Sequence, residues 1–175
     1  QSPYENRDKR FYRAILANGM SFKDYTIETF KGGADDGIVS QGGSPTGYFL
    51  RKYIQEATSF EPGKEAVSKH HWVIYRYAET LLTYAESMVN AFNDVNYTDE
   101  TYKYSALWAI NEVRKNAEMP LIPTMGKDEF MERLYNEWRV EFAFEDHRFW
   151  DVRRWKIADT TQRELYGVKI EKQAD

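Results

Sequence analysis

The sequence predicts a mostly helical protein in which antiparallel helix pairs follow a loop-rich, mixed N-terminal subdomain. Two observations lead to this expectation. In the second part of the chain, apolar residues recur at spacings of three and four, which is the period of an amphipathic helix. Before residue 70, in contrast, glycines are frequent and only short runs with strand character lie between them.

The loop-rich subdomain is expected to cover residues 1–70. Residues 11–16 fit either a strand or a helical turn, and residues 25–30 alternate as in a short strand. The glycine-containing stretches 32–37 and 42–45 are typical of loops. A loop-rich stretch of this length is usually functional, or is held in place by another part of the protein.

The helical pairs are expected within residues 71–158. Asn93-Asp94 ends the first helix, and the hydroxyl of Thr98 offers an N-terminal cap for the second. The second helix stops before Pro120, because proline cannot continue a helix. The first helix carries an apolar stripe at spacings of three and four: Ile74, Ala78, Leu81, Ala85, Met88 and Phe92.

A third helix is expected from about Lys127, with an apolar stripe that includes Phe130 and Trp138, and a short fourth helix from Arg148 to Ala158. Short connections favour antiparallel pairs, an arrangement similar to tetratricopeptide repeats. No complete repeat of about 34 residues is visible, so the similarity is partial. Residues 159–175 form a polar tail for which no structure is expected.

The composition excludes several classes of function. The net charge of -4 argues against a nucleic-acid partner, since phosphate binding needs a clustered basic face. The apolar runs are far shorter than the roughly 20 residues that a membrane-spanning helix needs. The absence of cysteine excludes disulfides, thiol nucleophiles and thiolate zinc sites. Gln1 is followed by neither a basic nor an apolar leader region, so we expect any targeting signal or anchor upstream of this segment.

A column of carboxylates, Glu137, Glu141 and Glu145, is the densest polar feature of the sequence. Like charges one turn apart repel by about 0.2–0.5 kcal/mol per pair, so compensating cations are expected. Four arginines are candidates, two in helical register and two on other predicted helices: Arg133, Arg148, Arg76 and Arg114.

Two interpretations of this column stay open. Glycosidases need two carboxyls roughly 5–9.5 Å apart, and one helical turn supplies about 6 Å. The favoured interpretation is an ion-paired network that joins helices, because neighbouring arginines lower a carboxyl pKa whereas a general acid needs it raised. The aromatic content of 16% is equally open, since aromatic rings either stack on sugars or fill a core.

No cofactor and no metal is expected from the remaining motifs. His70 and His71 point to different faces and lack a third ligand at useful spacing. Asp35-Asp36-Gly37 lacks the alternating acidic pattern of a calcium loop, and the paired glycines lack the following lysine of a phosphate loop. The sequence contains no strong catalytic motif, and we therefore expect that this protein is not an enzyme.

Several segments, in order, resemble elements of the SusD/RagB family. Arg76-Tyr77-Ala78-Glu79, continued by Leu81-Leu82 and Tyr84-Ala85-Glu86, is similar to the family's RYAE-x-LL-x-YAE signature. The segment from Glu137 to Trp155 resembles its most distinctive block. Three further segments also match: Asn6–Phe11, Thr46–Tyr53 and Ile110–Arg114.

The resemblance implies a non-catalytic lipoprotein at the outer-membrane surface of Bacteroidetes-type bacteria. Such proteins pair with a SusC-like TonB-dependent transporter and capture glycans, or peptides in some members, for polysaccharide utilization. It also implies that an N-terminal half with the lipidated cysteine is absent from this segment. The membrane is then contacted only through a lipid anchor outside it. The matching motifs are scaffold, and family ligands are held by variable loops, so no motif residue is transferred to the site.

We therefore predict ligand contacts on the loops, at Tyr25, Phe30, Gln41 and Tyr48, which offer stacking faces and hydrogen-bonding groups. The alternative is that Tyr25 and Phe30 lie in a strand and pack inward. Five aromatic residues of the distinctive block are expected to form an apolar layer beneath Arg148, Asp151 and Arg154: Trp138, Phe142, Phe149, Trp150 and Trp155.

The function expected from residues and resemblance together is the capture of oligosaccharide or polysaccharide by a cell-surface binding subunit. Two other classes stay open: a helical scaffold that binds protein or peptide, and a glycoside hydrolase that uses the carboxylate column.

Overall fold

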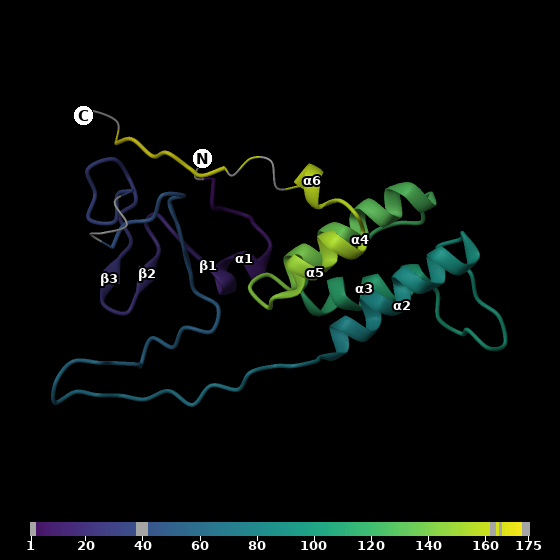
Figure 1. Cartoon of the computed structure of the whole chain (residues 1–175), viewed down its shortest axis with the longest axis horizontal. Helices are drawn as coiled ribbons and strands as arrows, with labels where there is room; N and C mark the ends of the chain where they lie inside the picture. Colours follow the sequence, from purple (N-terminus) through teal and green to yellow (C-terminus); the bar gives the residue numbers. More distant parts are fainter. Residues whose placement is uncertain (1–2, 38–41, 162–163, 165, 173–175) are drawn as a thin grey trace. The chain divides into compact units, whose positions relative to one another are not determined.

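The computed structural model describes residues 3–37, 42–161, 164 and 166–172. The chain divides into two compact units, shown together in Figure 1. The loop unit consists of Gln1–Arg7, Phe11–His71 and Trp155–Asp175. The helical unit consists of Asp8–Arg10 and Trp72–Arg154.

Two small antiparallel sheets organise the loop unit. Helix α1 (Lys9–Ala14) leads directly into strand β1 (Ile15–Ala17), which pairs with β4 (Tyr48–Leu50). Strands β2 (Ser21–Phe22) and β3 (Tyr25–Thr26) form a tight hairpin. The open choice between helix and strand at residues 11–16 is thus resolved by a helix that changes into a strand. The strand expected at residues 25–30 is only two residues long.

The C-terminal segment of the loop unit is ordered by backbone contacts. After the short helix α6 (Ala158–Thr161), the Val168 amide donates to Thr46 O at 2.9 Å, and the Lys31 amide donates to Ile170 O at 2.8 Å. Two glycines permit this approach, since a Cβ at Gly47 would lie 2.8 Å from Val168 Cγ1, and one at Gly167 would lie 2.8 Å from Thr46 Cα. The tail predicted to lack structure is therefore paired with a loop over part of its length.

Four helices form the helical unit: α2 (Tyr77–Phe92), α3 (Ala106–Asn116), α4 (Lys127–Glu141) and α5 (His147–Arg154). Helix α2 packs against both α3 and α4, and the three lie side by side in Figure 1. The apolar faces predicted from spacing meet between them. The largest fully buried apolar side chains lie in this unit: Phe130, Leu82, Ile110, Leu134, Val89 and Val152.

Two polar residues of α3 fix the connection to α4 through hydrogen bonds to its backbone. The side-chain amide of Asn111 donates to Ile122 O at 3.0 Å, and its oxygen accepts from the Ile122 amide at 2.9 Å. Arg114 Nε donates to Pro120 O at 2.8 Å. These hydrogen bonds satisfy backbone groups of the loop that have no partner within a helix. They therefore fix the direction in which the chain enters α4.

Helix boundaries differ from the prediction in three places. Ile74 precedes α2 and is 89% exposed, so it does not extend the apolar stripe. Helix α3 is capped by Ser105, whose hydroxyl accepts from the Trp108 amide at 3.1 Å, whereas Thr98 lies in the preceding loop. The helix predicted from Arg148 to Ala158 begins at His147 and stops at Arg154, and the left-handed backbone at Lys156 (φ 58°) separates it from α6.

The fold is thus helix-rich with small antiparallel sheets, in agreement with the predicted class at this level. Over the described residues, no helix is both long enough and apolar enough to cross a membrane.

Candidate functional site

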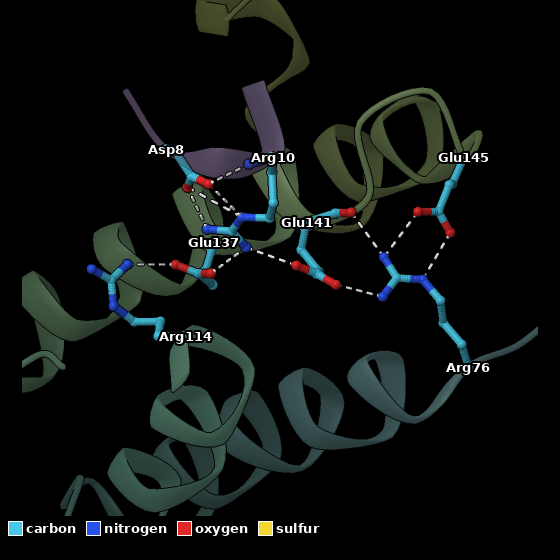
Figure 2. A network of polar contacts seen from close by, with 7 residues as sticks. All are labelled: Asp8, Arg10, Arg76, Arg114, Glu137, Glu141 and Glu145. Atoms are coloured by element: carbon cyan, nitrogen blue, oxygen red, sulfur yellow. Dashed lines mark hydrogen bonds and ion pairs between the residues drawn. The ribbon is translucent and has the colours of Figure 1, made fainter. Parts of the chain in front are cut away.

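The carboxylate column lies at the C-terminal end of α4 and in the turn that follows it (Figure 2). Glu137 is almost completely buried, with 1% of its surface exposed, and Glu141 and Glu145 retain about a tenth of their side-chain surface. Burying a carboxylate without a partner is very costly. The function of this site therefore depends on what surrounds the three groups.

Glu137 is held by two arginines from distant parts of the chain. Arg10 Nη1 donates to one carboxylate oxygen and Arg114 Nη1 to the other, both at 2.7 Å. Arg10 also donates to Glu141 at 2.7 Å, and its Nη2 donates to Asp8 at 2.7 Å. Arg10 thus contacts two successive turns of α4, as Figure 2 shows.

Arg76 closes the other end of the network. Its Nε and Nη2 donate to the two oxygens of Glu145, each at 2.9 Å, and Nη1 donates to Glu141. Nη2 also donates to the backbone oxygen of Glu141 at 2.8 Å, and the guanidinium lies 4.1 Å from the centre of the Phe142 ring. Such bidentate, charge-assisted pairs are the strong ones in proteins. Arg76 therefore fixes the chain entering α2 to the end of α4.

The electrostatics of the network favour the ionised forms of Asp8 and Arg10. Burial alone would raise the pKa of Asp8, but hydrogen bonds from Arg10 outweigh burial and hold this pKa below its ordinary value. Burial alone would lower the pKa of Arg10, yet Asp8, Glu137 and Glu141 raise it. A general acid must carry a proton, and here each glutamate of the column accepts from an arginine instead. The site is therefore suited to holding helices together and unsuited to acid–base catalysis.

The predicted ion-paired network is present, but two of the arginines predicted to pair with its glutamates do not do so. Arg76 and Arg114 do cross from other elements, but Arg133 pairs with Glu129 at 3.6 Å rather than with Glu137. No ion pair joins Arg148 to Glu145 within the described residues, because the left-handed turn after α4 breaks the helical register between them. Arg10 was missed, since nothing local in a sequence relates residues 127 positions apart.

A second ion pair cluster lies beside α5. Arg154 donates to Glu86 at 2.6 Å and to Asp151 at 2.9 Å, and its guanidinium lies 5.1 Å from the Trp138 ring. Trp138 and Phe142 are buried as predicted. The prediction was wrong for Phe149, which is 52% exposed, and for Trp150, which is 66% exposed, whereas Trp155 is half-buried.

Three of the four predicted ligand contacts, Tyr25, Phe30 and Tyr48, lie in described parts of the loop unit, where no hydrogen bond or ring contact joins one of them to another. Tyr25 is 44% exposed, and its hydroxyl donates to Asp35 at 2.7 Å. Phe30 is half-buried, with the ammonium of Lys172 4.2 Å from its ring centre. Tyr48 is half-buried in β4, edge-on to Tyr4. Gln41 lies outside the described residues. Ligand binding at these four positions stays a prediction.

A cavity of about 260 Å³ lies in the same unit. It brings together polar side chains from two parts of the chain: Thr29, Lys31, Asp36, Ser44 and Lys169. The Thr29 hydroxyl is buried and has no hydrogen-bond partner among the described residues. Sequence reasoning missed this cavity because its wall depends on the pairing of residues 168–170 with the loops.

No group of three or more histidine, cysteine, aspartate or glutamate side chains is placed to hold a metal ion in the described part of the chain. His70 lies edge-on to the ring of Tyr53, with 4.9 Å between ring centres.

The fold and its buried charges define a helix-rich domain whose densest polar cluster is a scaffold. Comparison with known proteins identifies the family: the model of the SusD family matches residues 1–173, and the chain belongs to this family. None of the curated proteins compared with the chain matches it.

The solved structures that are similar to this chain include two from Bacteroides species. A SusD-like protein from Bacteroides fragilis shares 33% identity over 95% of this chain, with a TM-score of 0.76. A SusD superfamily protein from Bacteroides vulgatus shares 20% identity over 92% of it, with a TM-score of 0.63, and supports the fold alone. The chain spans 31% and 32% of the lengths of these two proteins.

Proposed function

We propose that this chain is part of a non-catalytic, cell-surface subunit that captures oligosaccharide for import through a SusC-like, TonB-dependent transporter. The observation that carries the proposal is the SusD family match over residues 1–173. Attachment to the outer membrane through a lipid anchor outside this segment belongs to the same proposal, as does a tetratricopeptide-like arrangement of the helix pairs.

The ion-paired network supports a binding role over a hydrolytic one. A retaining or inverting glycosidase needs one carboxyl that can give a proton to the leaving oxygen. In this chain each carboxylate of the column accepts from Arg10, Arg76 or Arg114. Replacing a glutamate of the column should therefore lower the stability of the fold. Because we expect no hydrolytic activity, no activity should be lost.

We place the ligand contacts of this chain on the loop unit. Tyr25 presents an exposed ring, and Asp35 orients its hydroxyl. The cavity lined by Lys31, Asp36 and Lys169 supplies donors and acceptors for sugar hydroxyls. Phe30, Gln41 and Tyr48 remain in the proposed site as flanking residues.

Native affinity electrophoresis against a panel of soluble polysaccharides tests the proposal when a reducing-sugar assay is run on the same samples. The protein should be retarded by at least one glycan without forming new reducing ends. Tyr25→Ala should weaken that retardation. Tyr75→Ala, which removes an exposed tyrosine of the helical unit, should leave retardation unchanged. New reducing ends would refute the non-catalytic role, and equal loss with both variants would refute the placement of the site.

A helical scaffold that binds a protein or peptide is the second candidate, and one observation favours it. The segment before α2 exposes several large apolar side chains, with Trp72 at 65%, Ile74 at 89% and Tyr75 at 61%. Surfaces of this kind are typical of protein contacts. Retention on a peptide array in the absence of any glycan retardation would favour this candidate.

A further inference from the structure

The turn after α4 and the first turn of α5 form a surface that neither the ion-pair network nor the proposed glycan contacts use. We define the aromatic–arginine surface as Arg139, Phe144, Arg148, Phe149 and Trp150. These residues line a cavity of about 700 Å³, all within the helical unit. The other residues of its wall are Phe142, Ala143 and Asp146.

Three large aromatic side chains of this surface are half exposed or more. Phe144 is 50% exposed, Phe149 52% and Trp150 66%. Phe144 also has a left-handed backbone (φ 63°), a conformation that bulky side chains rarely adopt. Three adjacent large rings that face solvent, one of them in a strained conformation, are the pattern of a surface that is covered by a partner.

Its two arginines, the exposed Arg139 and the half-buried Arg148, lack the carboxylate partners that the half-buried arginines of the ion-paired network have. No ion pair involves Arg139 or Arg148 in the described part of the chain, whereas Arg10, Arg76 and Arg114 each hold at least one glutamate. Burial, and next the charge of Arg139, lower the pKa of Arg148, which Asp151 only partly offsets. Two neighbouring cations at the edge of an apolar cavity fit an occupant that carries carboxylates.

The rings themselves favour apolar side chains over sugars. One face of Phe149 is already covered by the Arg153 guanidinium, 3.4 Å from the ring centre. Phe149 and Trp150 lie edge to face, with 5.0 Å between their centres. Phenylalanine rings also lack the polar group with which tyrosine and tryptophan meet wet, hydroxyl-rich ligands. The surface is thus closer to half of a protein core than to a sugar platform.

The solved relatives suggest the source of the occupant. The chain aligns with 31% and 32% of their lengths, so about two thirds of a family-length polypeptide lies outside the match. We propose that the aromatic–arginine surface receives an apolar segment bearing carboxylates, supplied by that remaining part of a family-length polypeptide. The inference goes beyond the proposed function, because it concerns contacts within the folded subunit. It does not depend on which glycan is bound.

Hydroxyl-radical footprinting with mass spectrometry tests the contact directly. It compares the natural family-length polypeptide that contains this sequence with the 175-residue chain alone. The proposal expects Trp150 and Phe149 to be oxidised at least about tenfold more slowly in the longer polypeptide, as burial of a ring in a packed core requires. Equal oxidation in the two would overturn it, as would a natural polypeptide no longer than this chain.

Charge variants of the longer polypeptide test the predicted carboxylate. Arg148→Glu should raise Trp150 oxidation towards the rate of the isolated chain, and Arg148→Lys should keep most of the protection. Arg133→Glu is the matched control, because Arg133 is an exposed arginine of α4 away from the cavity, and it should change nothing. An unchanged rate in Arg148→Glu would overturn the charge pairing.

Two other occupants give different results in the same assay. A second copy of this chain would protect Trp150 in the isolated chain as its concentration rises. An acidic glycan would protect it only after a polyuronate such as polygalacturonate is added. Either outcome would overturn the proposal, and neither would bear on whether glycans bind the loop unit.

Discussion

The two units of this chain are stabilised in different ways, the helical unit by side-chain packing and the loop unit by backbone contacts. Of the 20 buried apolar residues among those that the structure describes, 16 lie in the helical unit and 4 in the loop unit. Nine of the ten glycines lie in the loop unit, and Gly126 is the exception. The helical unit is held by side chains that meet across helices, whereas the loop unit is held by backbone hydrogen bonds between short strands, loops and the C-terminal segment.

This difference predicts which substitutions should destabilise each unit. In the helical unit the largest effects should come from removing a buried charge or ring. In the loop unit they should come from adding an atom where two backbones touch. Four substitutions, taken from the largest expected effect to the smallest, can break or sharpen this comparison.

Glu137→Ala should destabilise the helical unit most, by about 3–5 kcal/mol, because it leaves two buried arginines without their shared carboxylate. Urea denaturation followed by helical circular dichroism would measure the loss. Glu129→Ala removes an exposed pair on the same helix and should cost no more than about 0.5 kcal/mol. Similar losses for the two variants would show that the network contributes little.

Gly47→Ala should destabilise the loop unit by roughly 2 kcal/mol. Its left-handed backbone (φ 74°) costs about 1–2 kcal/mol for a residue with a Cβ, and that Cβ would lie 2.9 Å from Val168 O. Hydrogen exchange of the Val168 amide, which donates to Thr46 O, would report the opening.

The matched control for this variant is Gly63→Ala, which has the same backbone strain (φ 80°) and no neighbour within 4 Å. It should leave the exchange of the Val168 amide unchanged. If both variants accelerate exchange equally, close backbone approach is not what holds the loop unit together.

Ser105→Ala should lower the stability of the helical unit by about 1 kcal/mol, because the Trp108 amide loses its acceptor at the start of α3. Thermal denaturation would measure the change. Thr98→Ala is the contrasting variant, since Thr98 is the cap that the sequence suggested and the structure places it in the loop. A larger loss for Thr98→Ala would reverse the assignment of the cap.

Asp8→Asn should have the smallest effect, visible mainly in acid. Because the folded-state pKa of Asp8 is lowered, its contribution is fully present above its unfolded-state pKa, near the ordinary value of 3.8, and is lost as pH falls through the lower folded value. Urea stability measured from pH 7 to pH 2 should therefore fall less steeply below about pH 4 in this variant. Asp24→Asn, in an exposed turn, should retain the wild-type slope.

The sequence predicted those parts of the fold that depend on local periodicity. Leu81, Ala85 and Met88 recur at helical spacing and are all buried on α2, because one face of an amphipathic helix must meet its neighbour. It also predicted that Arg76 and Arg114 would reach the carboxylate column. Opposite charges on successive helices leave few other arrangements when the carboxylates are buried.

Features that depend on distant pairing could not be predicted in the same way. Arg10 was not identified, since its partners lie 127 and 131 positions away. The small cavity of the loop unit was missed because its wall includes residues 168–170, in a tail whose composition gave no structural signal. Phe149 and Trp150 were expected to be buried because they are aromatic, but burial needs packing on all sides, and within the described residues these rings stay 52% and 66% exposed.

The reach of Arg10 has a consequence for how the protein is made. During synthesis at about 5–20 residues per second, Arg10 emerges roughly 6–25 s before Glu137. For that interval its charge has no glutamate of α4 to meet, and the column cannot close until most of the chain has left the ribosome. Contacts of such high sequence separation also slow folding, since a long loop must be ordered before the contact forms. The helical unit is therefore completed late, because four residues of its network, Asp8, Arg10, Arg76 and Arg114, are synthesised before the three glutamates that they contact directly or through Arg10.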